Sequence, residues 1–401
     1  MGIGGFQSLL GYNLMMNVYS ERHEAWQRAG LERQPLPVQG PQGPFLQVGG
    51  RKMLAFCSND YLGLANDPRV CAAAEEALRH YGVGAGASAL VCGYSAPQAD
   101  LEERLADWLQ QERALVFSSG YLAHLGIMPV LMDQETEVFS DALNHASLID
   151  GIRLARPGRV TVYPHGDMTA LEQALRNSTA LRRWIVTDGV FSMDGDVAPL
   201  QVLASLAERH GAWLLIDDAH GMGVLGPEGR GSVADAGLTG EHILVLGTFG
   251  KALGTAGAVL VGARGVMDWL AQRARTHMFS TALPPLLCAA TREAVACVRA
   301  ESFRRARLHH LGLGLQNGLR RAGLPVLPSV TAIHPVLAGD NRRVMALDRG
   351  LKEAGLWVAA IRPPAVPEGT ARLRISLTAL HTMHQVERLV ESLRQVWEAT
   401  S

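Results

Sequence analysis

Segments with the pattern of buried strands alternate with segments with the pattern of amphipathic helices through the middle of the chain. The runs RWIVTDGVF (183–191), AWLLIDDAH (212–220) and HILVLGTFGKA (242–252) are apolar, as buried strands are. DMTALEQALRN (167–177) carries apolar residues at helical spacing behind a capping aspartate, and PLQVLASLAERHG (199–211) places proline at its first helical position and glycine just past its end. Strand and helix patterns that alternate in this way predict an α/β fold, in which helices cover both faces of a mostly parallel sheet.

The pattern changes after about residue 295. ARLRISL (371–377) alternates apolar and polar residues like a half-exposed strand, and Thr382 and Gln385 form a capping box before a long amphipathic helix. These features predict a smaller α+β domain at the carboxyl end. We expect an amino-terminal segment (1–45) that packs on this small domain, a large domain (46–294) and the small domain itself (295–401).

Composition and the amino-terminal stretch narrow the class of protein. The chain has 401 residues and a net charge of −1, which gives no reason to expect nucleic acid or an anionic membrane as a partner. Its five cysteines form no C-x-x-C pair and no zinc-like spacing, so we expect a reduced compartment and no metal. The first residues lack the basic region of a signal peptide, and no apolar run reaches the length of a membrane span. A cytoplasmic enzyme is the expectation.

One lysine stands in a loop between two apolar strands. Lys251 lies within LGTFGKALGTAGA (246–258). It could extend to solvent as a surface lysine, bind phosphate as a P-loop lysine, or act as a desolvated nucleophile. The P-loop alternative fails, because that motif needs glycine at the position of Val245 and Ser or Thr at the position of Ala252.

Two further polar groups follow predicted strands. Ser119, Gly120 and Tyr121 open a helix after ALVF, and the N–H groups at such a helix start can hold a phosphate. An ordinary strand–helix turn has the same pattern. His145 falls in a turn or a first helical turn, where a lone histidine is more often a cap than a catalyst.

Three polar side chains stand close together after the apolar run WLLI (213–216). Asp217, Asp218 and His220 stand at this strand end, and two carboxylates beside an imidazole are costly to bury without partners. The next residues, 221–226, spell G-x-G-x-x-G, but Pro227 and the glycines around it prevent the helix that a dinucleotide-binding motif must open. We therefore reject a dinucleotide site.

Pyridoxal 5'-phosphate (PLP) needs the combination of groups found at these strand ends. Its phosphate needs backbone donors, its ring nitrogen needs a carboxylate, and its aldehyde needs a lysine amine. The sequence therefore predicts a PLP enzyme in which Lys251 carries the cofactor.

The motifs and their order resemble the α-oxoamine synthases, a family of fold-type I PLP enzymes. The resemblance covers about residues 33–396. The motifs that carry it are FCSNDYLGL (56–64), SSGY (118–121), NHASL (144–148), TDGVFSMDGD (187–196), DDAHGMGV (217–224), TFGKALG (248–254) and IRPPAVPEGTARLRISLTALH (361–381). The resemblance implies a fold-type I PLP-dependent transferase with a large sheet domain and a smaller carboxyl-terminal α+β domain.

Phosphate contacts are the first roles that the resemblance implies. Gly120, Tyr121 and Thr248 would hold the cofactor phosphate. Ser280 and Thr281 match residues that reach a phosphate across a dimer interface, which implies a homodimer. The family often has Phe at the position of Tyr121.

Ring contacts and catalytic roles are implied in the same way. His145 would stack on the cofactor ring and face the substrate, Asp217 would pair with the ring nitrogen, and His220 and Ser192 would contact the ring hydroxyl. Lys251, His145, Asp217 and His220 would be the catalytic residues.

The resemblance also implies substrate contacts. Arg374, assisted by Asn59, would hold the substrate carboxylate, and Arg33 would contact the acyl substrate. Two positions depart from the pattern: Asp188 stands where many relatives have Glu, and Ala365 stands where a substrate-contacting Thr is usual.

Within the family, the resemblance is greatest to the branch that condenses L-alanine with a pimeloyl thioester to 8-amino-7-oxononanoate in biotin biosynthesis. Coenzyme A and acyl carrier protein both remain open as acyl carriers. One alternative is a 2-amino-3-ketobutyrate CoA ligase or another member that uses glycine or serine. A catalytically silent PLP fold with a regulatory role is a second alternative, against which the intact lysine, aspartate and histidines argue.

Overall fold

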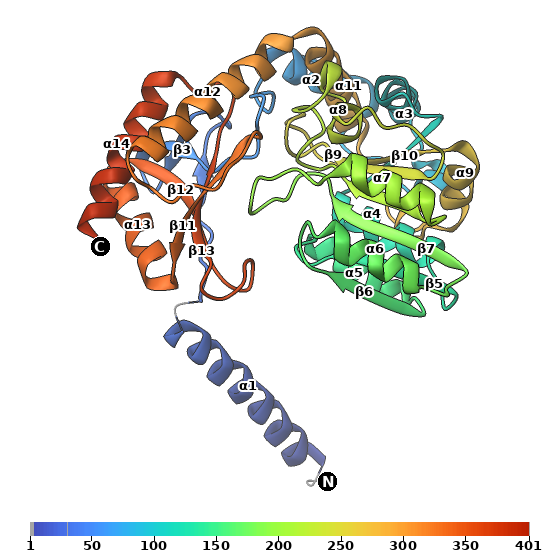
Figure 1. Cartoon of the computed structure of the whole chain (residues 1–401), viewed down its shortest axis with the longest axis horizontal. Coiled ribbons are helices and arrows are strands. Elements are labelled where there is room, and N and C mark those ends of the chain that lie inside the picture. Colours follow the sequence, from blue (N-terminus) through green and yellow to red (C-terminus); the bar gives the residue numbers. More distant parts are fainter. Residues whose placement is uncertain (1–3, 30, 401) are drawn as a thin grey trace.

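The computed structural model describes residues 4–29 and 31–400 and places most of them in two units, each built around one β-sheet (Figure 1). Residues 1–3, the beginning of the stretch in which a signal peptide was sought, lie outside the described residues. No helix in the described part of the chain combines the length and the apolar character that crossing a bilayer requires.

The larger sheet has seven strands. From edge to edge they are β4 (Arg113–Phe117), β10 (Ala258–Gly262), β9 (Ile243–Thr248), β8 (Trp213–Asp217), β7 (Arg182–Asp188), β5 (Thr136–Asp141) and β6 (Arg159–Tyr163). Strand β10 is antiparallel to both of its neighbours, and the strands from β9 to β6 are parallel to one another. The predicted mostly parallel sheet is therefore confirmed.

Helices cover both faces of this sheet because the strands are apolar on both faces. In β8, Leu214 and Ile216 belong to one buried core and Leu215 to another. The core of Leu214 includes residues from α2 (Pro68–Tyr81), α3 (Ala96–Leu109), α6 (Met168–Asn177), α7 (Leu200–Arg209), α8 (Ser232–Asp235) and α11 (Pro285–Ala300). The core of Leu215 includes residues from α4 (Gly120–Leu131), α5 (Ala146–Ala155) and α9 (Arg264–Arg273), which the short α10 (Arg275–Met278) follows.

The smaller sheet has six strands. Their order is β1 (Val38–Gln39), β2 (Phe45–Val48), β3 (Arg51–Phe56), β12 (Leu356–Ile361), β13 (Ala371–Ser376) and β11 (Ile333–Gly339). Helices α12 (Ser302–Arg321), α13 (Asn341–Glu353) and α14 (Met383–Ala399) complete this unit, and α12 extends from it toward the larger one (Figure 1). The α/β fold class with a carboxyl-terminal unit is thus confirmed.

The amino-terminal segment divides between two environments. Because β3 pairs with β12 in parallel, the chain from β1 to β3 lies in the sheet of the carboxyl-terminal unit. Helix α1 (Gly4–Arg28) instead projects away from both units (Figure 1), and its side chains from residue 15 onward are largely exposed. The predicted division at residues 45 and 294 stays a prediction, and the strand pairing favours a first boundary after β3.

Local signals at helix ends agree closely with the structure. Asp167 caps α6 through the N–H of Ala170, and Thr382 forms the predicted capping box with Gln385. One detail was wrong: Pro199 is the N-cap of α7 and not its first helical residue. After the G-x-G-x-x-G run there is a short 3-10 turn (Pro227–Gly229), not a long helix, and a π-helical turn spans Ala89–Gly93.

Candidate active site

The carboxyl ends of four parallel strands supply the polar groups of the site. Asp141 ends β5, Asp188 ends β7, Asp217 ends β8 and Thr248 ends β9. Parallel strands bring their carboxyl ends to one edge of the sheet, which is where α/β proteins bind ligands. Lys251 follows β9 in the next turn and joins this edge.

Lys251 has a weakly basic amine. Burial lowers its pKa from the ordinary value to about 8, and the negative charges of Asp217 and Asp188 only partly oppose this effect. Among the described residues, no carboxylate forms an ion pair with Lys251 within 4.0 Å. An enclosed amine with a lowered pKa and no paired carboxylate is suited to attack an aldehyde, because more of it is in the neutral, nucleophilic form at a given pH than for an ordinary lysine.

His145 is fixed at the start of α5, which it caps. Its backbone N–H donates to Oδ2 of Asp188 (2.7 Å), and its ring Nδ1 contacts the hydroxyl of Ser147 (2.7 Å). Asn144 joins the same strand ends, since its amide donates to the carbonyl of Val186 (2.7 Å) and accepts from the N–H of Asp188 (3.1 Å). Burial lowers the pKa of His145, so its ring is neutral near pH 7.

The two strand-end carboxylates differ in their surroundings. Burial, with the nearby charge of Asp217, holds the pKa of Asp188 well above its usual value. Asp217 accepts a hydrogen bond from the N–H of Ala219 (3.0 Å), and its other oxygen lies 3.9 Å from Nδ1 of His124. Burial lowers the pKa of His124 to about 4, so a neutral imidazole stands beside Asp217. The sequence interpretation did not identify His124.

Asp218 has a structural role. Its carboxylate accepts from the hydroxyl (2.6 Å) and the N–H (2.8 Å) of Ser232, and burial raises its pKa to about 7. It therefore holds the turn after β8, while Asp217 is left for a ligand.

A buried network connects the two units. The hydroxyl of Tyr61 lies 2.6 Å from Nδ1 of His220 and 3.1 Å from Oδ1 of Asn59. Nη2 of Arg374 donates to the same hydroxyl (3.3 Å), and Nη1 donates to Oδ1 of Asn59 (3.2 Å). Burial and the charge of Lys251 hold the pKa of His220 well below its usual value, so this imidazole is neutral. Tyr61 was quoted within a motif, but no role was predicted for it.

Arg374 has one N–H left for a ligand. A guanidinium has five N–H donors. Besides Tyr61 and Asn59, Arg374 donates through Nε to the carbonyl of Ser192 (2.5 Å) and through Nη1 to the hydroxyl of Ser376 (2.9 Å). Four donors are therefore engaged, and the orientation of the fifth is fixed by the other four.

The groups that could hold a phosphate lie at the start of α4 and the end of β9. Gly120 and Tyr121 are the first residues of α4, where backbone N–H groups have no partner within the helix. Ser119 caps this helix through the N–H of Leu122 (3.2 Å), and Thr248 donates to the carbonyl of Gly257 (3.1 Å). With the amine of Lys251 and the buried carboxylate of Asp217, these groups fit the donor and acceptor set of PLP.

Three predicted site residues lie elsewhere in the described chain. Arg33 donates to the carbonyls of Arg362 (3.1 Å) and Pro363 (3.0 Å), beside the end of β12. Ser280 is half-buried, and Thr281 forms an isolated β-bridge with Ser88. Tyr121, by contrast, stays at the site: its hydroxyl donates to Asp150, and its ring lies edge-on to His145 at 6.4 Å between ring centroids.

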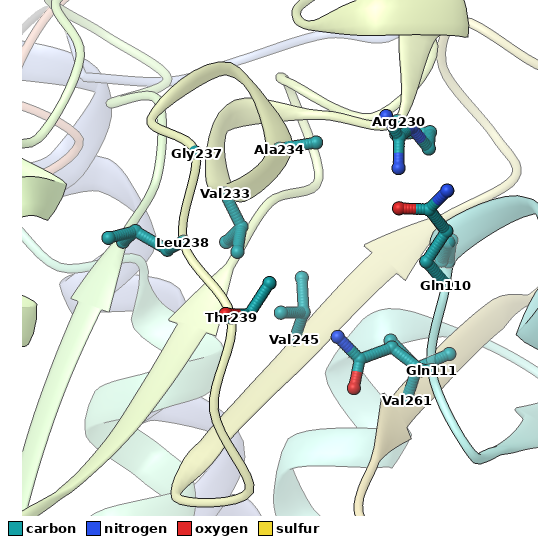
Figure 2. Close-up of a pocket in the computed structure, with 11 residues that line it drawn as sticks. Gln110, Gln111, Arg230, Val233, Ala234, Gly237, Leu238, Thr239, Val245 and Val261 are labelled. Atoms are coloured by element: carbon teal, nitrogen blue, oxygen red, sulfur yellow. The ribbon is translucent and has the colours of Figure 1, made fainter.

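A separate cavity of about 160 Å³ shares no residue with this site. It lies between the end of α3, the segment 230–239 and the strands β9 and β10. Figure 2 shows the polar side chains of Gln110, Gln111 and Arg230 on one side of it, with Val233 and Leu238 opposite.

Comparisons with known proteins agree with this geometry. Residues 51–393 match the family model of the class I and II aminotransferases. An 8-amino-7-oxononanoate synthase of Herminiimonas arsenicoxydans is 49% identical over 375 residues, which cover 92% of this chain and 96% of that relative. The enzyme of the same name from Aromatoleum aromaticum is 50% identical over 366 residues, 91% of this chain and 95% of that relative.

The chain belongs to the α-oxoamine synthase family. Solved structures of this family have the same fold. A serine palmitoyltransferase of Sphingomonas wittichii has a TM-score of 0.90 at 32% identity and covers 96% of this chain and 97% of that one. An 8-amino-7-oxononanoate synthase of Francisella tularensis has a TM-score of 0.76 at 26% identity, over 86% of this chain and 98% of that one. Another α-oxoamine synthase structure, of SPT, holds a PLP internal aldimine; it has a TM-score of 0.90 at 30% identity, over 96% of this chain and 97% of that one.

Proposed function

We propose that this chain is a PLP-dependent acyltransferase that condenses L-alanine with a pimeloyl thioester to give 8-amino-7-oxononanoate, a step in biotin biosynthesis. The observation that carries the proposal is the similarity to 8-amino-7-oxononanoate synthases, at 49–50% identity over more than nine-tenths of the chain. The amine, carboxylate, imidazoles and guanidinium described above supply the chemistry that this reaction needs.

Each cofactor contact is assigned to a group of suitable chemistry. Asp217 would accept a hydrogen bond from the protonated ring nitrogen, and His145 would contact the ring. The first N–H groups of α4 would bind the phosphate, and Thr248 would join them by turning its hydroxyl proton from the carbonyl of Gly257 to the phosphate. When bound, PLP stabilises negative charge at the Cα of an amino acid that is joined to it.

The neutral imidazole of His220 is oriented by Tyr61. The single hydroxyl proton of Tyr61 is best placed on the 2.6 Å contact to Nδ1 of His220, since its contact to Asn59 is longer. His220 then carries its own proton on Nε2, from which it can donate to the ring hydroxyl, and Ser192 assists there. A neutral His220 suits this role because it adds no positive charge beside Lys251.

Lys251 and Arg374 act on the amino acid. With a pKa of about 8, the amine of Lys251 can accept the proton of Cα near neutral pH. The remaining N–H of Arg374 donates to the substrate carboxylate, and Asn59 keeps the guanidinium in place. The contact of Arg33 with the acyl substrate follows from the resemblance alone, since its guanidinium donates to the carbonyls of Arg362 and Pro363.

The reaction balances with no oxidant or reductant. Cα of alanine loses its proton and forms a bond to the acyl carbon, and the C–S bond breaks to release the thiol of coenzyme A or of a carrier protein. The bond from Cα to the carboxylate then breaks and releases carbon dioxide. A proton returns to Cα and gives the amino ketone.

An exposed apolar surface supports a homodimer. Val83, Val91 and Phe279 are between 66% and 77% exposed, and Leu90 and Tyr94 are about half exposed. A β-bridge between Ser88 and Thr281 joins the two chain segments that carry this surface. Ser280 and Thr281, which the resemblance assigns to the partner's phosphate site, therefore adjoin the apolar surface. Sedimentation should give twice the mass of one chain.

We also propose that the enzyme works in the cytoplasm. All five cysteines are free thiols, which suits a reducing compartment. The partners we propose are an amino acid, an acyl thioester and a second copy of the chain.

Turnover with a panel of amino acids and thioesters tests the proposal. L-alanine with pimeloyl thioester should give the highest kcat/KM among alanine, glycine and serine, each paired with acetyl, pimeloyl and palmitoyl thioesters. One methyl group changes discrimination by only about 1–3 kcal/mol, so some turnover of glycine is expected. If glycine with acetyl-CoA is the best pair, the protein is a 2-amino-3-ketobutyrate CoA ligase. If serine with palmitoyl-CoA is best, it is a serine palmitoyltransferase.

A further inference from the structure

A histidine outside the site described above joins two of its turns. His165 follows β6, and its two ring nitrogens each contact a carboxylate: Nδ1 lies 3.0 Å from Asp141, and Nε2 lies 3.0 Å from Asp196. The hydrogen bonds to Asp141 and Asp196 raise the pKa of His165 to about 10, so the ring is an imidazolium at neutral pH. Its ring also stands edge-on to Phe191, with the ring centroids 4.4 Å apart.

The carboxylate of Asp141 anchors the turn that leads to His145. One oxygen accepts from the N–H of Leu143 (2.8 Å), and the other accepts from the N–H of Gly166 (3.0 Å). The backbone carbonyl of Asp141 accepts from the N–H of Asn144 (3.3 Å). The path from His165 to the ring of His145 is therefore short and held by hydrogen bonds.

The carboxylate of Asp196 belongs to the 192–196 turn, which the carboxyl-terminal unit binds. The carbonyl of Ser192 accepts from Arg374 (2.5 Å), and the carboxylate of Asp194 pairs with Arg372 (2.5 Å). The carbonyl of Gly195 accepts from the hydroxyls of Ser329 and Thr331, both at 3.0 Å.

The 192–196 turn also packs closely on the same unit. Gly195 has a positive φ of 72°, and a Cβ there would lie 2.3 Å from the carbonyl oxygen of Ile333. The turn is thus pressed against β11, next to β13. On the side of the larger unit, the second carboxylate oxygen of Asp196 is buried with no hydrogen-bond partner among the described residues, so His165 is the group that compensates this carboxylate.

We propose that His165 is a positioning residue, which joins Asp141 to Asp196 and thereby fixes the turn of His145 relative to the turn that orients Arg374. The inference rests on the proposed role of Arg374 in binding the substrate carboxylate. Without the contacts of His165 to Asp141 and Asp196, the 192–196 turn should shift. The free N–H of Arg374 would shift with it, because Arg374 is bound to the carbonyl of Ser192. The acyl substrate would be little affected, because Arg33 is held separately by the carbonyls at the end of β12.

His165→Phe and Asp196→Ala test the proposal in the holoenzyme. Phenylalanine keeps a ring against Phe191 but removes both nitrogens, and Asp196→Ala removes one carboxylate while leaving His165 in place. Each variant should raise the KM for L-alanine about tenfold, the order of magnitude that one charge-assisted hydrogen bond is worth. The KM for the thioester should change less than about threefold. Because the two residues act as one unit, the double variant should raise the alanine KM no more than the worse single variant.

Two controls separate positioning from general loss of structure. His384→Phe changes an exposed histidine at the start of α14 and should leave every parameter unchanged. Hydrogen exchange needs no turnover, and the amides of Phe191 and Gly195, which close the turn by hydrogen bonds, should exchange faster in His165→Phe than in the wild type. The exchange result does not depend on which substrate pair the wild type turns over. It therefore distinguishes a failure of the positioning role from a failure of the proposed function. An unchanged alanine KM in both single variants overturns the proposal, whatever happens to stability.

Discussion

Replacing Arg374 with lysine should impair the binding of L-alanine selectively. The guanidinium uses four of its five N–H donors on Ser192, Asn59, Ser376 and Tyr61. A lysine ammonium has three donors at one point, so it cannot keep these contacts and also reach a ligand. Arg374→Lys keeps the positive charge, but it removes the N–H donor whose direction the other four hydrogen bonds fix.

The size of the effect follows from the contact that is lost. A hydrogen bond to a charged group contributes about 1.5–3 kcal/mol, which corresponds to roughly 10-fold to 150-fold in an equilibrium constant. We expect the KM for L-alanine to rise within this range, with little change in the KM for the thioester. The assay is steady-state release of the thiol at saturating thioester and varied alanine.

A second arginine provides the control for this substitution. Arg183 stands at the amino-terminal end of β7 and makes three hydrogen bonds from a half-buried position, to Ser178 and His210. Arg183→Lys should leave the alanine KM unchanged. If Arg374→Lys also leaves it within about threefold of the wild type, Arg374 does not bind the substrate carboxylate.

Three further predictions concern the cofactor site. Lys251→Ala should fold but give no adduct with PLP that borohydride can fix to the chain, and fixation to another lysine would contradict the assignment. Asp217→Asn should slow exchange of the Cα proton of alanine in deuterated water by about tenfold or more, from the loss of a charge-assisted hydrogen bond; exchange at the wild-type rate would exclude the role. Binding of PLP to the apoenzyme should accelerate as the pH rises through about 8. The reason is that about a tenth of the Lys251 amines are neutral at pH 7 and about nine-tenths at pH 9. A binding rate that falls over this range would refute the lowered pKa.

The strand ends were the most predictable part of the site. Lys251, Asp217 and the turn of His145 follow apolar runs, and parallel strands bring such positions together at one edge. The same rule could have found His165, because PHGD (164–167) directly follows the strand β6. A histidine in a polar turn has no local feature that distinguishes it from a solvated one, and its importance depends on the two carboxylates that reach it from β5 and from the turn after β7.

Other site residues depend on pairings that no local pattern contains. Tyr61 contacts His220 across 159 positions of sequence, and its burial is set by both units. Tyr61 follows three polar residues and precedes the apolar Leu62, so the motif does not tell whether its ring is buried, and only the tertiary structure shows that its hydroxyl is hydrogen-bonded. The position of His124 is equally hard to predict, since no residue pattern in α4 indicates that its side chain lies beside Asp217.

The larger sheet was predictable and the smaller one was not. Strands β7 and β8 are each followed by a helical segment before the next parallel strand, so alternation predicts this part of the arrangement. In the smaller sheet, β3 pairs with β12 about 300 residues away. No alternation of strand and helix patterns connects two strands so far apart, so the sequence does not predict that they pair. Local composition therefore does not reveal that β3 belongs with the carboxyl-terminal sheet, and the boundary at residue 45 stays a prediction.

The central claim is that the enzyme joins an acyl group to the Cα of alanine and removes the carboxylate of that alanine. L-alanine labelled with ¹³C in its carboxyl group tests this claim most directly, with pimeloyl-CoA as the acyl donor. We predict one labelled carbon dioxide per thiol released, and an amino ketone of the mass of 8-amino-7-oxononanoate without the label. A product that keeps the label, or labelled carbon dioxide formed at the same rate without the thioester, would contradict it.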